Sequence, residues 1–390
     1  MASNLTIAIL PGDGIGIEIT KPCVDLIQQA LKQVGEAPIN ENWLEAGAAT
    51  YTKLGTSLPD ETIAGCRSAD AILLAAMGDP SVRYPDGTEI IPQIELRFIL
   101  ELYAGVRPVR SVPGIKGPLA DPRGDELDFV LIRESTEGLF ASVGKGSRDD
   151  DQATDTQVIT RKGTKQVCDF AFKLAQQRKA SGHPGVVTSV DKANVFKSMA
   201  FWRDMFDEVA ADYPDISKQY GYVDAVAMEM VRRPWIYDVM VTENMYGDIL
   251  SDLGAGLIGG LGMAPSADIG DNHAVFQPCH GSAPDIAGTG KANPTAMFLS
   301  GAMMLEWLAG EKKQPSLSTA ASYLTHSVDA AFAKAVPEIA ALLRAMMGPG
   351  SLHSGTMARW SLALFQTCPG AASEILPACK ACVDTLSVRQ

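Results

Sequence analysis

Short apolar runs alternate with amphipathic helical segments along this chain, and this alternation restricts the fold more than any other sequence feature. Strand-sized apolar runs lie at residues 6–10, 71–77, 129–132, 185–190 and 237–241. Apolar residues at helical spacing lie at 16–35, 163–181, 193–213, 294–308, 316–335 and 354–366, and a further helix begins near Gly247. Loops are predicted at 78–87, 144–154 and the glycine-rich 254–270. The alternation predicts an α/β architecture with largely parallel strand pairing.

The charge balance excludes several classes of protein. Across 390 residues the formal net charge is −13, which disfavours a nucleic-acid binder because phosphate contacts need surplus Lys and Arg. It also means that an anionic ligand must be bound by local groups rather than attracted by the whole molecule. No apolar run approaches the ~18–20 residues of a membrane span, and no basic leader precedes the first run. Seven dispersed cysteines, Cys379 and Cys382 in the tail among them, are typical of reduced thiols, so we expect a cytoplasmic protein.

A glycine-rich loop, LPGDGIG at 10–16, follows the first strand and precedes a helix. This position is typical of a nucleotide-binding fingerprint, but the spacing G-x-G-x-x-G fails because position 17 is Ile. From the residues alone, a plain turn and a ligand-contacting loop are equally good interpretations.

Three aspartates stand where a carboxylate needs a partner. Asp248 and Asp252 are four residues apart, so on a helix they lie on one face and repel each other unless a cation binds between them. Oxygen ligands of this kind suit Mg²⁺ or Mn²⁺, although acids also favour a first helical turn for dipole reasons. Asp224 lies inside an apolar stretch, where a buried carboxylate is costly unless it is paired or bound to metal.

Basic residues and one polar loop complete the candidate set. Lys192, in SVDKAN after a strand, suits either a structural ion pair or an acid/base group. Arg97, Arg107 and Arg133, each taken singly, are most simply surface arginines. The segment HGSAPDIAG from His280 is a polar, backbone-rich loop of the kind that wraps a nucleotide.

Together these segments resemble the β-decarboxylating hydroxyacid dehydrogenases: the 3-isopropylmalate, isocitrate, homoisocitrate and tartrate/malate dehydrogenases. The resemblance runs from residue 7 to about 365. It is carried, in order, by LPGDGIG (10–16), LYAGVRPVR (102–110), RESTEGLF (133–140), SVDKANV (189–195), YVDAVAM (222–228), TENMYGDILSD (242–252) and HGSAPDIAGTGKANPTA (280–296).

The resemblance implies the two-domain α/β fold of isopropylmalate and isocitrate dehydrogenases, which is not a Rossmann fold. Domain 1 is expected at 1–106 plus 260–390 and domain 2 at 107–259, the latter carrying the metal site and the dimer interface. It also implies a homodimer in which each active site borrows residues from the neighbouring subunit.

The resemblance further implies the role of each site residue. Arg97, Arg107 and Arg133 match the arginines that bind substrate carboxylates, with Asn194 beside the nicotinamide. Asp248 and Asp252 match metal ligands, and Asp224 of the partner subunit matches a third ligand of the same ion. Lys192, also from the partner subunit, matches the base that takes the hydroxyl proton. The nucleotide contacts match Ile15, His280, Gly281, Ser282, Ala283, Asp285 and Asn293. Because a carboxylate at Asp285 accepts from a ribose 2′-hydroxyl and repels a 2′-phosphate, we expect NAD rather than NADP.

The sequence departs from the family pattern at two places. Phe140 stands where the family has a Tyr that protonates the enolate carbon. Either another group or water supplies the proton, or decarboxylation is incomplete, or activity is impaired. In the segment before Arg97, Gln93 and Ile94 stand where the isopropylmalate enzymes have two leucines, and Ile91 and Gln93 stand where the isocitrate enzymes have Ser and Asn.

We therefore expect NAD-dependent, Mg²⁺- or Mn²⁺-dependent oxidation and decarboxylation of a 3-substituted malate, with 3-isopropylmalate first. The tartrate/malate type comes second, favoured by GDPSVRYPDG at 78–87, and isocitrate or homoisocitrate third. Two readings of another class stay open: a catalytically weakened paralogue, and an iron- or zinc-thiolate protein built on the C-terminal cysteines.

Overall fold

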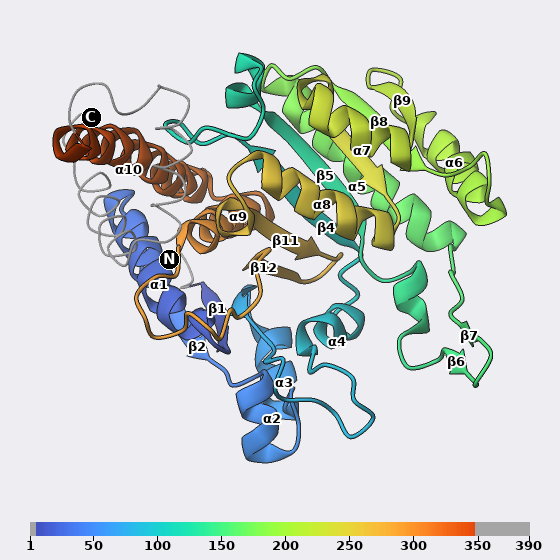
Figure 1. Ribbon diagram of the computed structural model, residues 1–390, viewed down its shortest axis with the longest axis horizontal. Coiled ribbons are helices and arrows are strands. Elements are labelled where there is room, and N and C mark those ends of the chain that lie inside the picture. Colours follow the sequence, from blue (N-terminus) through green and yellow to red (C-terminus); the bar gives the residue numbers. More distant parts are fainter. Residues whose placement is uncertain (1–4, 348–390) are drawn as a thin grey trace.

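The computed structural model describes residues 5–347 and contains one mixed sheet of ten strands (Figure 1). The strand order is β2-β1-β3-β12-β11-β4-β5-β10-β8-β9. The strands are β1 (Thr6–Gly12), β2 (Asn40–Trp43), β3 (Ala71–Ala76), β4 (Ala104–Arg110), β5 (Asp128–Glu134), β8 (Val186–Asp191), β9 (Ser217–Tyr222), β10 (Val239–Thr242), β11 (Pro265–Ile269) and β12 (Ala274–Pro278). The predicted α/β class is confirmed.

Parallel pairing dominates the two ends of the sheet, while the centre is antiparallel. The contacts β11–β12, β11–β4 and β4–β5 are antiparallel, and the neighbouring pairs outside them are parallel. A separate hairpin, β6 (Ser147–Arg148) and β7 (Ala153–Thr154), lies inside the segment predicted as the loop 144–154. All ten strands share one sheet, so the sheet does not itself divide the chain in two. The division into two domains stays a prediction.

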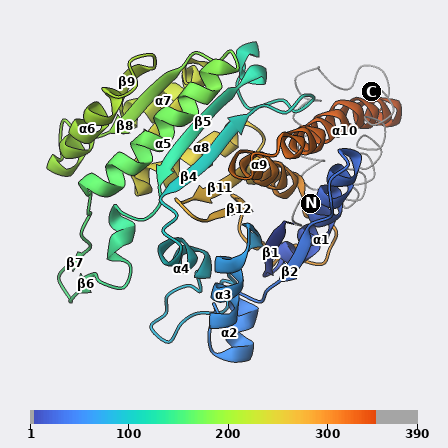
Figure 2. The same ribbon diagram turned by 180° about the vertical axis from the view of Figure 1, so that it is seen from behind.

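Helices cover both faces of the sheet. They are α1 (Ile15–Gln33), α2 (Ala48–Leu54), α3 (Asp60–Ser68), α4 (Pro92–Ile99), α5 (Arg161–Ala180), α6 (Lys197–Ala210), α7 (Val223–Arg232), α8 (Asn244–Leu257), α9 (Thr295–Glu311) and α10 (Pro315–Met347). Helices α7 and α8 cover one face of the β5 half, and α5 and α6 cover the opposite face, as the front and back views show (Figures 1 and 2). Helix α9 packs on β11, β12 and β3, and α1 and α10 pack against it.

Large apolar side chains fill the space between sheet and helices. Phe172 on α5, Phe206 and Trp202 on α6 are completely buried, and each such side chain contributes about 1.5–3 kcal/mol of hydrophobic stabilisation. Apolar periodicity therefore identified the core face of α6. On α5 it predicts Phe170 and Leu174, which are only partly buried, rather than Phe172. Within residues 5–347, none of the helices combines the length and apolar character that crossing a membrane requires.

Two predicted boundaries are wrong. The segment 254–270 is not one loop, because α8 continues to Leu257 and β11 begins at Pro265. Helix α6 begins at Lys197 rather than at 193, since residues 192–196 form a turn in which Lys192 O accepts from the amides of Val195 and Phe196. The predicted helix at 354–366 and the cysteines Cys379 and Cys382 lie outside the described residues.

Candidate active site

Strand register gathers charged side chains on one face at the antiparallel centre of the sheet. Gly105 on β4 is paired with Asp268 on β11 at one side and with Arg133 on β5 at the other. Arg107 lies two residues further along β4 and therefore on the same face as Gly105. A Cβ at Gly105 would stand 3.1 Å from Asp268 Oδ1, so the missing side chain leaves room for the cluster.

Asp268 joins two of the predicted substrate-binding arginines. Its carboxylate accepts from Arg97 Nε at 3.0 Å and from Arg107 Nη2 at 3.2 Å, and all three side chains are buried. Gln277 Nε2 on β12 donates to the same carboxylate at 2.7 Å. Burial alone would raise the pKa of Asp268, but the charges of Arg97, Arg107 and Arg133 outweigh burial and hold this pKa at about 2.

Arg133 connects the arginines to helix α8. Its Nε and Nη2 donate to Asn244 Oδ1 at 2.9 and 2.7 Å, and its Nη1 pairs with Asp248. Burial and the neighbouring charge of Arg97 lower the Arg133 pKa to about 10, so this guanidinium stays charged at neutral pH. The three arginines are buried, and the simple interpretation of them as surface residues is wrong.

A pocket of about 160 Å³ opens in front of this cluster. Its polar lining comes from β4, β5, α4, α8 and the strand β12 with the loop after it. Among the lining residues are Gln93, Arg97, Arg107, Arg133, Asp248, Asp252, Gln277, His280 and Gly281. The structure thus brings together the three predicted arginines and two of the three predicted metal ligands.

Asp248 and Asp252 provide hard oxygen donors one helical turn apart on α8. The Asp248 side chain is 50% exposed, and burial together with the Asp248 charge raises the pKa of Asp252. This donor set suits Mg²⁺ or Mn²⁺. Among the side chains that the structure describes, residues 5–333, no group of three or more His, Cys, Asp or Glu is placed to hold a metal ion.

Lys192, Asn194 and Asp224 do not line that pocket. Lys192 pairs with Asp224 instead, and the Asp224 side chain is 68% exposed. The expectation that Asp224 is buried in its apolar segment is wrong for the single chain, because α7 turns this residue outward. Asn194 is exposed in the turn before α6.

Phe140 faces Arg133 from the short helical turn after β5. The Arg133 Cζ atom lies 5.0 Å from the centroid of the Phe140 ring. The ring can stabilise the guanidinium through a cation–π contact but carries no transferable proton.

A second pocket, of about 250 Å³, lies between the first glycine loop and the loop after β12. The two loops are joined, since Ile15 N donates to Ser282 O at 2.8 Å and Ser282 Oγ donates to Gly78 O. Four of the predicted nucleotide contacts line this pocket: Ile15, His280, Ala283 and Asn293. Gly281 lines the arginine pocket, and Asp285 is exposed.

His280 lines both pockets and so marks where they meet. Its Nδ1 bonds Gly281 O at 2.9 Å, while its Nε2 is buried and has no hydrogen-bond partner within the described part of the chain. Burial lowers the pKa of His280, so the ring is neutral at pH 7 and offers one unused polar atom to a ligand. A nucleotide base fits such an atom.

Sequence reasoning missed Asp268, Gln277 and Asp13. Asp13, inside the glycine loop, is buried and accepts from Ala48 N at 2.7 Å and from Gly78 N at 2.8 Å, so it holds three loops together. No local pattern marks Asp268, because its segment PSADI also holds the polar Ser266 and does not stand out as a buried strand.

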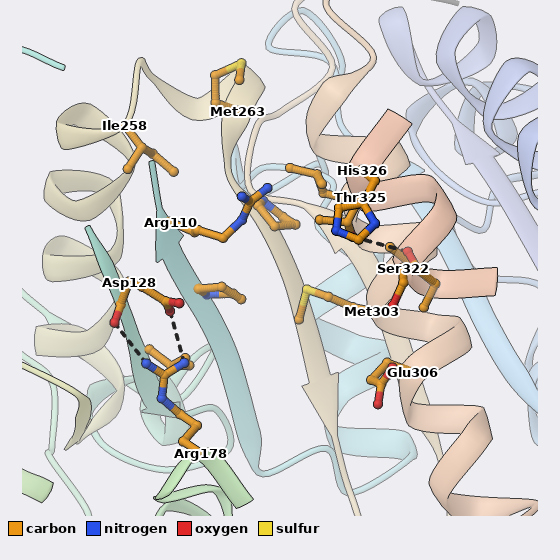
Figure 3. Close-up of a pocket in the computed structure, with 16 residues that line it drawn as sticks. Arg110, Asp128, Arg178, Ile258, Met263, Met303, Glu306, Ser322, Thr325 and His326 are labelled. Carbon is orange, nitrogen blue, oxygen red and sulfur yellow. Dashed lines mark hydrogen bonds and ion pairs between the residues drawn. The ribbon is translucent and has the colours of Figure 1, made fainter. Parts of the chain in front are cut away.

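A larger cavity, of about 370 Å³, contains none of the predicted site residues (Figure 3). Its arginines are already paired: Arg110 with Asp329 at 2.8 Å, and Arg178 with Asp128 at 3.1 Å. Because none of the predicted site residues lines this cavity, we assign the chemistry to the arginine pocket and to the pocket beside Ile15 and Asn293.

Comparison with known proteins gives consistent matches over most of the chain. The isocitrate/isopropylmalate dehydrogenase family model matches residues 6–340. A 3-isopropylmalate/3-methylmalate dehydrogenase of Methanocaldococcus jannaschii is 42% identical over 303 residues, 77% of this chain and 85% of the relative. A 3-isopropylmalate dehydrogenase of Corynebacterium kroppenstedtii is 39% identical, covering 81% of this chain and 92% of the relative. The solved isocitrate dehydrogenase of Methylococcus capsulatus has a TM-score of 0.72 and 34% identity, covering 93% of this chain and 100% of that one.

Proposed function

Because the chain belongs to the isocitrate/isopropylmalate dehydrogenase family, we propose that it oxidises and decarboxylates a 3-substituted malate, with 3-isopropylmalate as the first candidate. The fold of that family, rather than a Rossmann fold, is confirmed by the match to the solved relative. One observation carries the proposal: three buried arginines and two acidic side chains line a single pocket.

The arginines suit a substrate with two carboxylates. Guanidinium groups bind carboxylates through two parallel hydrogen bonds, and buried guanidinium groups do so with little competition from water. In this proposal Arg97, Arg107 and Arg133 bind and orient the substrate carboxylates. Asp248 and Asp252 provide oxygen ligands for a divalent cation, and Asp224 of the partner subunit is the third.

Proton transfer at the hydroxyl is assigned to Lys192 of the partner subunit. An amine can take the hydroxyl proton only when it is held within hydrogen-bond reach, and in the single chain Lys192 is paired with Asp224. When bound, the nicotinamide would accept hydride from carbon 2, and the divalent cation would polarise the hydroxyl and its neighbouring carboxylate. We place Asn194 beside that hydride path.

NAD is the proposed nucleotide. Ile15, His280, Gly281, Ser282, Ala283 and Asn293 would hold its adenosine and phosphates. Asp285, exposed at the rim of this loop, would accept from the ribose 2′-hydroxyl and repel a 2′-phosphate. The unpartnered His280 Nε2 supports a ligand in this place.

A homodimer with shared active sites completes the proposal. Helices α7 and α8 expose apolar side chains on the surface that also carries Asp224: Met228 is 49% exposed, Val231 52% and Ile249 60%. Such a surface is typical of an interface rather than of a solvated helix pair. Because Lys192 and Asp224 lie outside their own chain's pocket, a partner chain that brings them to it would supply the missing base and ligand. We retain the boundaries 1–106 plus 260–390 and 107–259 for the two domains.

The tartrate/malate type is the second candidate, favoured by Gln93. Its Oε1 atom is buried at the arginine pocket and lacks a hydrogen-bond partner among the described residues. A hydroxyl at carbon 3 of the substrate would donate to it, whereas an alkyl group would leave it unsatisfied.

Purified protein should reduce NAD⁺ in the presence of Mn²⁺ and a 3-substituted malate, measured as NADH absorbance at 340 nm. The panel comprises 3-isopropylmalate, 3-methylmalate, tartrate, malate, isocitrate and homoisocitrate. Chelation with EDTA should abolish turnover, and Mn²⁺ or Mg²⁺ should restore it. The absence of NADH with every acid would sink the enzyme proposal and favour a catalytically weakened paralogue.

A further inference from the structure

The carboxylate of Asp268 contacts two arginines of the pocket, yet it has no role in the proposed reaction. It is 0% exposed, and four donors surround it. Oδ1 accepts from Arg107 Nη2 and from Ser135 Oγ, at 3.2 and 3.3 Å. Oδ2 accepts from Arg97 Nε and from Gln277 Nε2, at 3.0 and 2.7 Å.

Three of these donors are N–H groups, and the fourth is the Ser135 hydroxyl, which lies equally close to Arg133 O. Asp268 does not line the pocket, so it makes no contact there with a metal ion or a substrate group. It acts on the arginines instead. Arg97 donates to Asp268 through Nε, so the two terminal nitrogens of Arg97 are not part of this bond. Arg107 is held at two points, since its Nη2 donates to Asp268 and its Nη1 donates to Ala267 O at 3.0 Å.

Asp268 also sets the charge that the arginines present. Three guanidinium groups with one buried carboxylate leave a net charge of +2 around the carboxylate-binding part of the pocket. Asp248, which pairs with Arg133, and Asp252 would be balanced by the divalent cation of the proposed function. A malate carrying an uncharged 3-substituent has two carboxylates and matches this charge. A substrate with a third carboxylate would place an unbalanced anion beside Asp268.

We propose that Asp268 is a specificity-determining positioning residue that restricts the pocket to dicarboxylates and disfavours 3-substituents carrying a third carboxylate. This inference rests on the proposed function and deepens it, because it applies to 3-alkylmalates and to tartrate alike. Gln277 contributes to this arrangement, because its amide nitrogen donates to Asp268. A carboxylate at position 277 would instead lie 2.7 Å from the carboxylate of Asp268.

A matched pair of ligands tests the charge effect. Isocitrate carries a CH₂–COO⁻ group on carbon 3, and 3-isobutylmalate has nearly the same shape with two methyl groups in place of the two oxygens. Wild type should bind and turn over 3-isobutylmalate better than isocitrate. Asp268→Asn should raise the isocitrate/3-isobutylmalate ratio of kcat/KM by ~10- to 100-fold, the effect expected of one charge at this range and burial.

The control is Asp238→Asn. Asp238 is also a buried carboxylate, 1% exposed, and it pairs with Arg178 at 2.6 Å and with the amide of Gly185 at 2.8 Å, away from the pocket. It should lower the melting temperature without changing the ratio. An unchanged ratio in Asp268→Asn, or the same change in both variants, would overturn the inference.

A further measurement keeps the inference testable if Asp268→Asn does not fold. Calorimetric binding of the two ligands to Mn²⁺-loaded wild-type protein should favour 3-isobutylmalate, and tighter binding of isocitrate would overturn the inference. If no acid is turned over, the proposed function fails, and the relative affinities of the two ligands for the Mn²⁺-loaded protein still test Asp268, so the two failures are distinguishable.

Discussion

At the residue scale, Phe140 is a position where the sequence departs from the family pattern that the resemblance implies. Its ring lies against the Arg133 guanidinium, at 5.0 Å from the centroid to Cζ, so it stands beside a group that would bind substrate carboxylate. A phenol at this position could protonate an enolate carbon next to that carboxylate. The phenyl ring leaves protonation to water or to another group.

We predict that Phe140→Tyr raises the amount of decarboxylated product per NADH formed, and speeds the protonation step by at least ~10-fold, because it adds a general acid. Product ratios by NMR, together with absorbance at 340 nm, measure this. Phe201→Tyr is the control, since Phe201 also lies near a guanidinium, 5.9 Å from Arg161, on helix α6. Equal product ratios and turnover in Phe140→Tyr and wild type would mean that Phe140 has no mechanistic significance.

Nucleotide choice is a second property that depends on single residues. We predict that Asp285→Lys combined with Ile286→Tyr raises the NADP/NAD ratio of kcat/KM by at least ~100-fold, because a cation replaces the carboxylate that repels a 2′-phosphate. Steady-state kinetics with both nucleotides measure the ratio. Glu61→Lys, on an exposed position of α3, controls for net charge. A double variant that still prefers NAD would argue against a ribose contact at Asp285.

The site residues that could be predicted from the sequence carry local patterns, and those that were missed do not. The pair Asp248 and Asp252 is visible from helical spacing, and the arginines from the family motifs. Asp268 meets Arg97 across 171 positions of sequence, through the insertion of β11 beside β4. No short window contains that contact, so only the fold reveals which charges are neutralised.

At the scale of elements, the exposed side of α7 and α8 is the feature that the single chain leaves unexplained. Both helices bury one face, yet Met228, Val231 and Ile249 remain in solvent. The apolar periodicity that predicts a helix does not say whether the second apolar face meets its own chain or another. Strand β11 shows another limit of sequence patterns. Its polar residues Ser266 and Asp268 made a completely buried strand resemble a loop.

We predict that Val231→Glu separates the dimer and lowers activity by at least ~10-fold, because a charge would be buried in an apolar interface. Sedimentation velocity measures the mass of the assembly, and steady-state kinetics measure kcat. Leu54→Glu, on α2, is a matched control because Leu54 and Val231 are both 52% exposed. If Val231→Glu remained a fully active dimer, this surface would not be the interface.

At the scale of the whole molecule, the acidic charge of −13 coexists with a pocket lined by arginines. The local charges that would bind a substrate come from segments spread between positions 97 and 252, whereas the overall charge is a property of the surface. Composition therefore disfavours nucleic acid as a class of ligand, but it carries no information about a small anionic substrate. The proposed sharing of each active site between two subunits is a property of the assembly, which composition does not reveal either.

We predict that two inactive variants restore activity when mixed. Lys192→Gln lacks the proposed base, and Arg133→Gln lacks a substrate-binding arginine of its own chain. If sites are shared, the hybrid dimer has one intact site, and random exchange of subunits recovers about a quarter of wild-type activity. Denaturing and refolding the mixture, with each variant alone as control, measures this. Recovery of none would indicate that each chain builds its own site.

The placement of β11 and β12 has a consequence for the synthesis of the chain. Strands β3 and β4 never pair with each other, because β12 and β11 lie between them. On a ribosome the free edges of β3 and β4 must therefore wait until residue 278 has emerged, an interval of about 10–40 s after β3 at ordinary elongation rates of ~5–20 residues per second. We expect limited proteolysis of ribosome-bound chains to show resistance only once they extend beyond β12. A long unpaired interval exposes two apolar strand edges to wrong partners, so the efficiency of producing this protein in a cell should depend on translation speed and on chaperones as much as on its final stability.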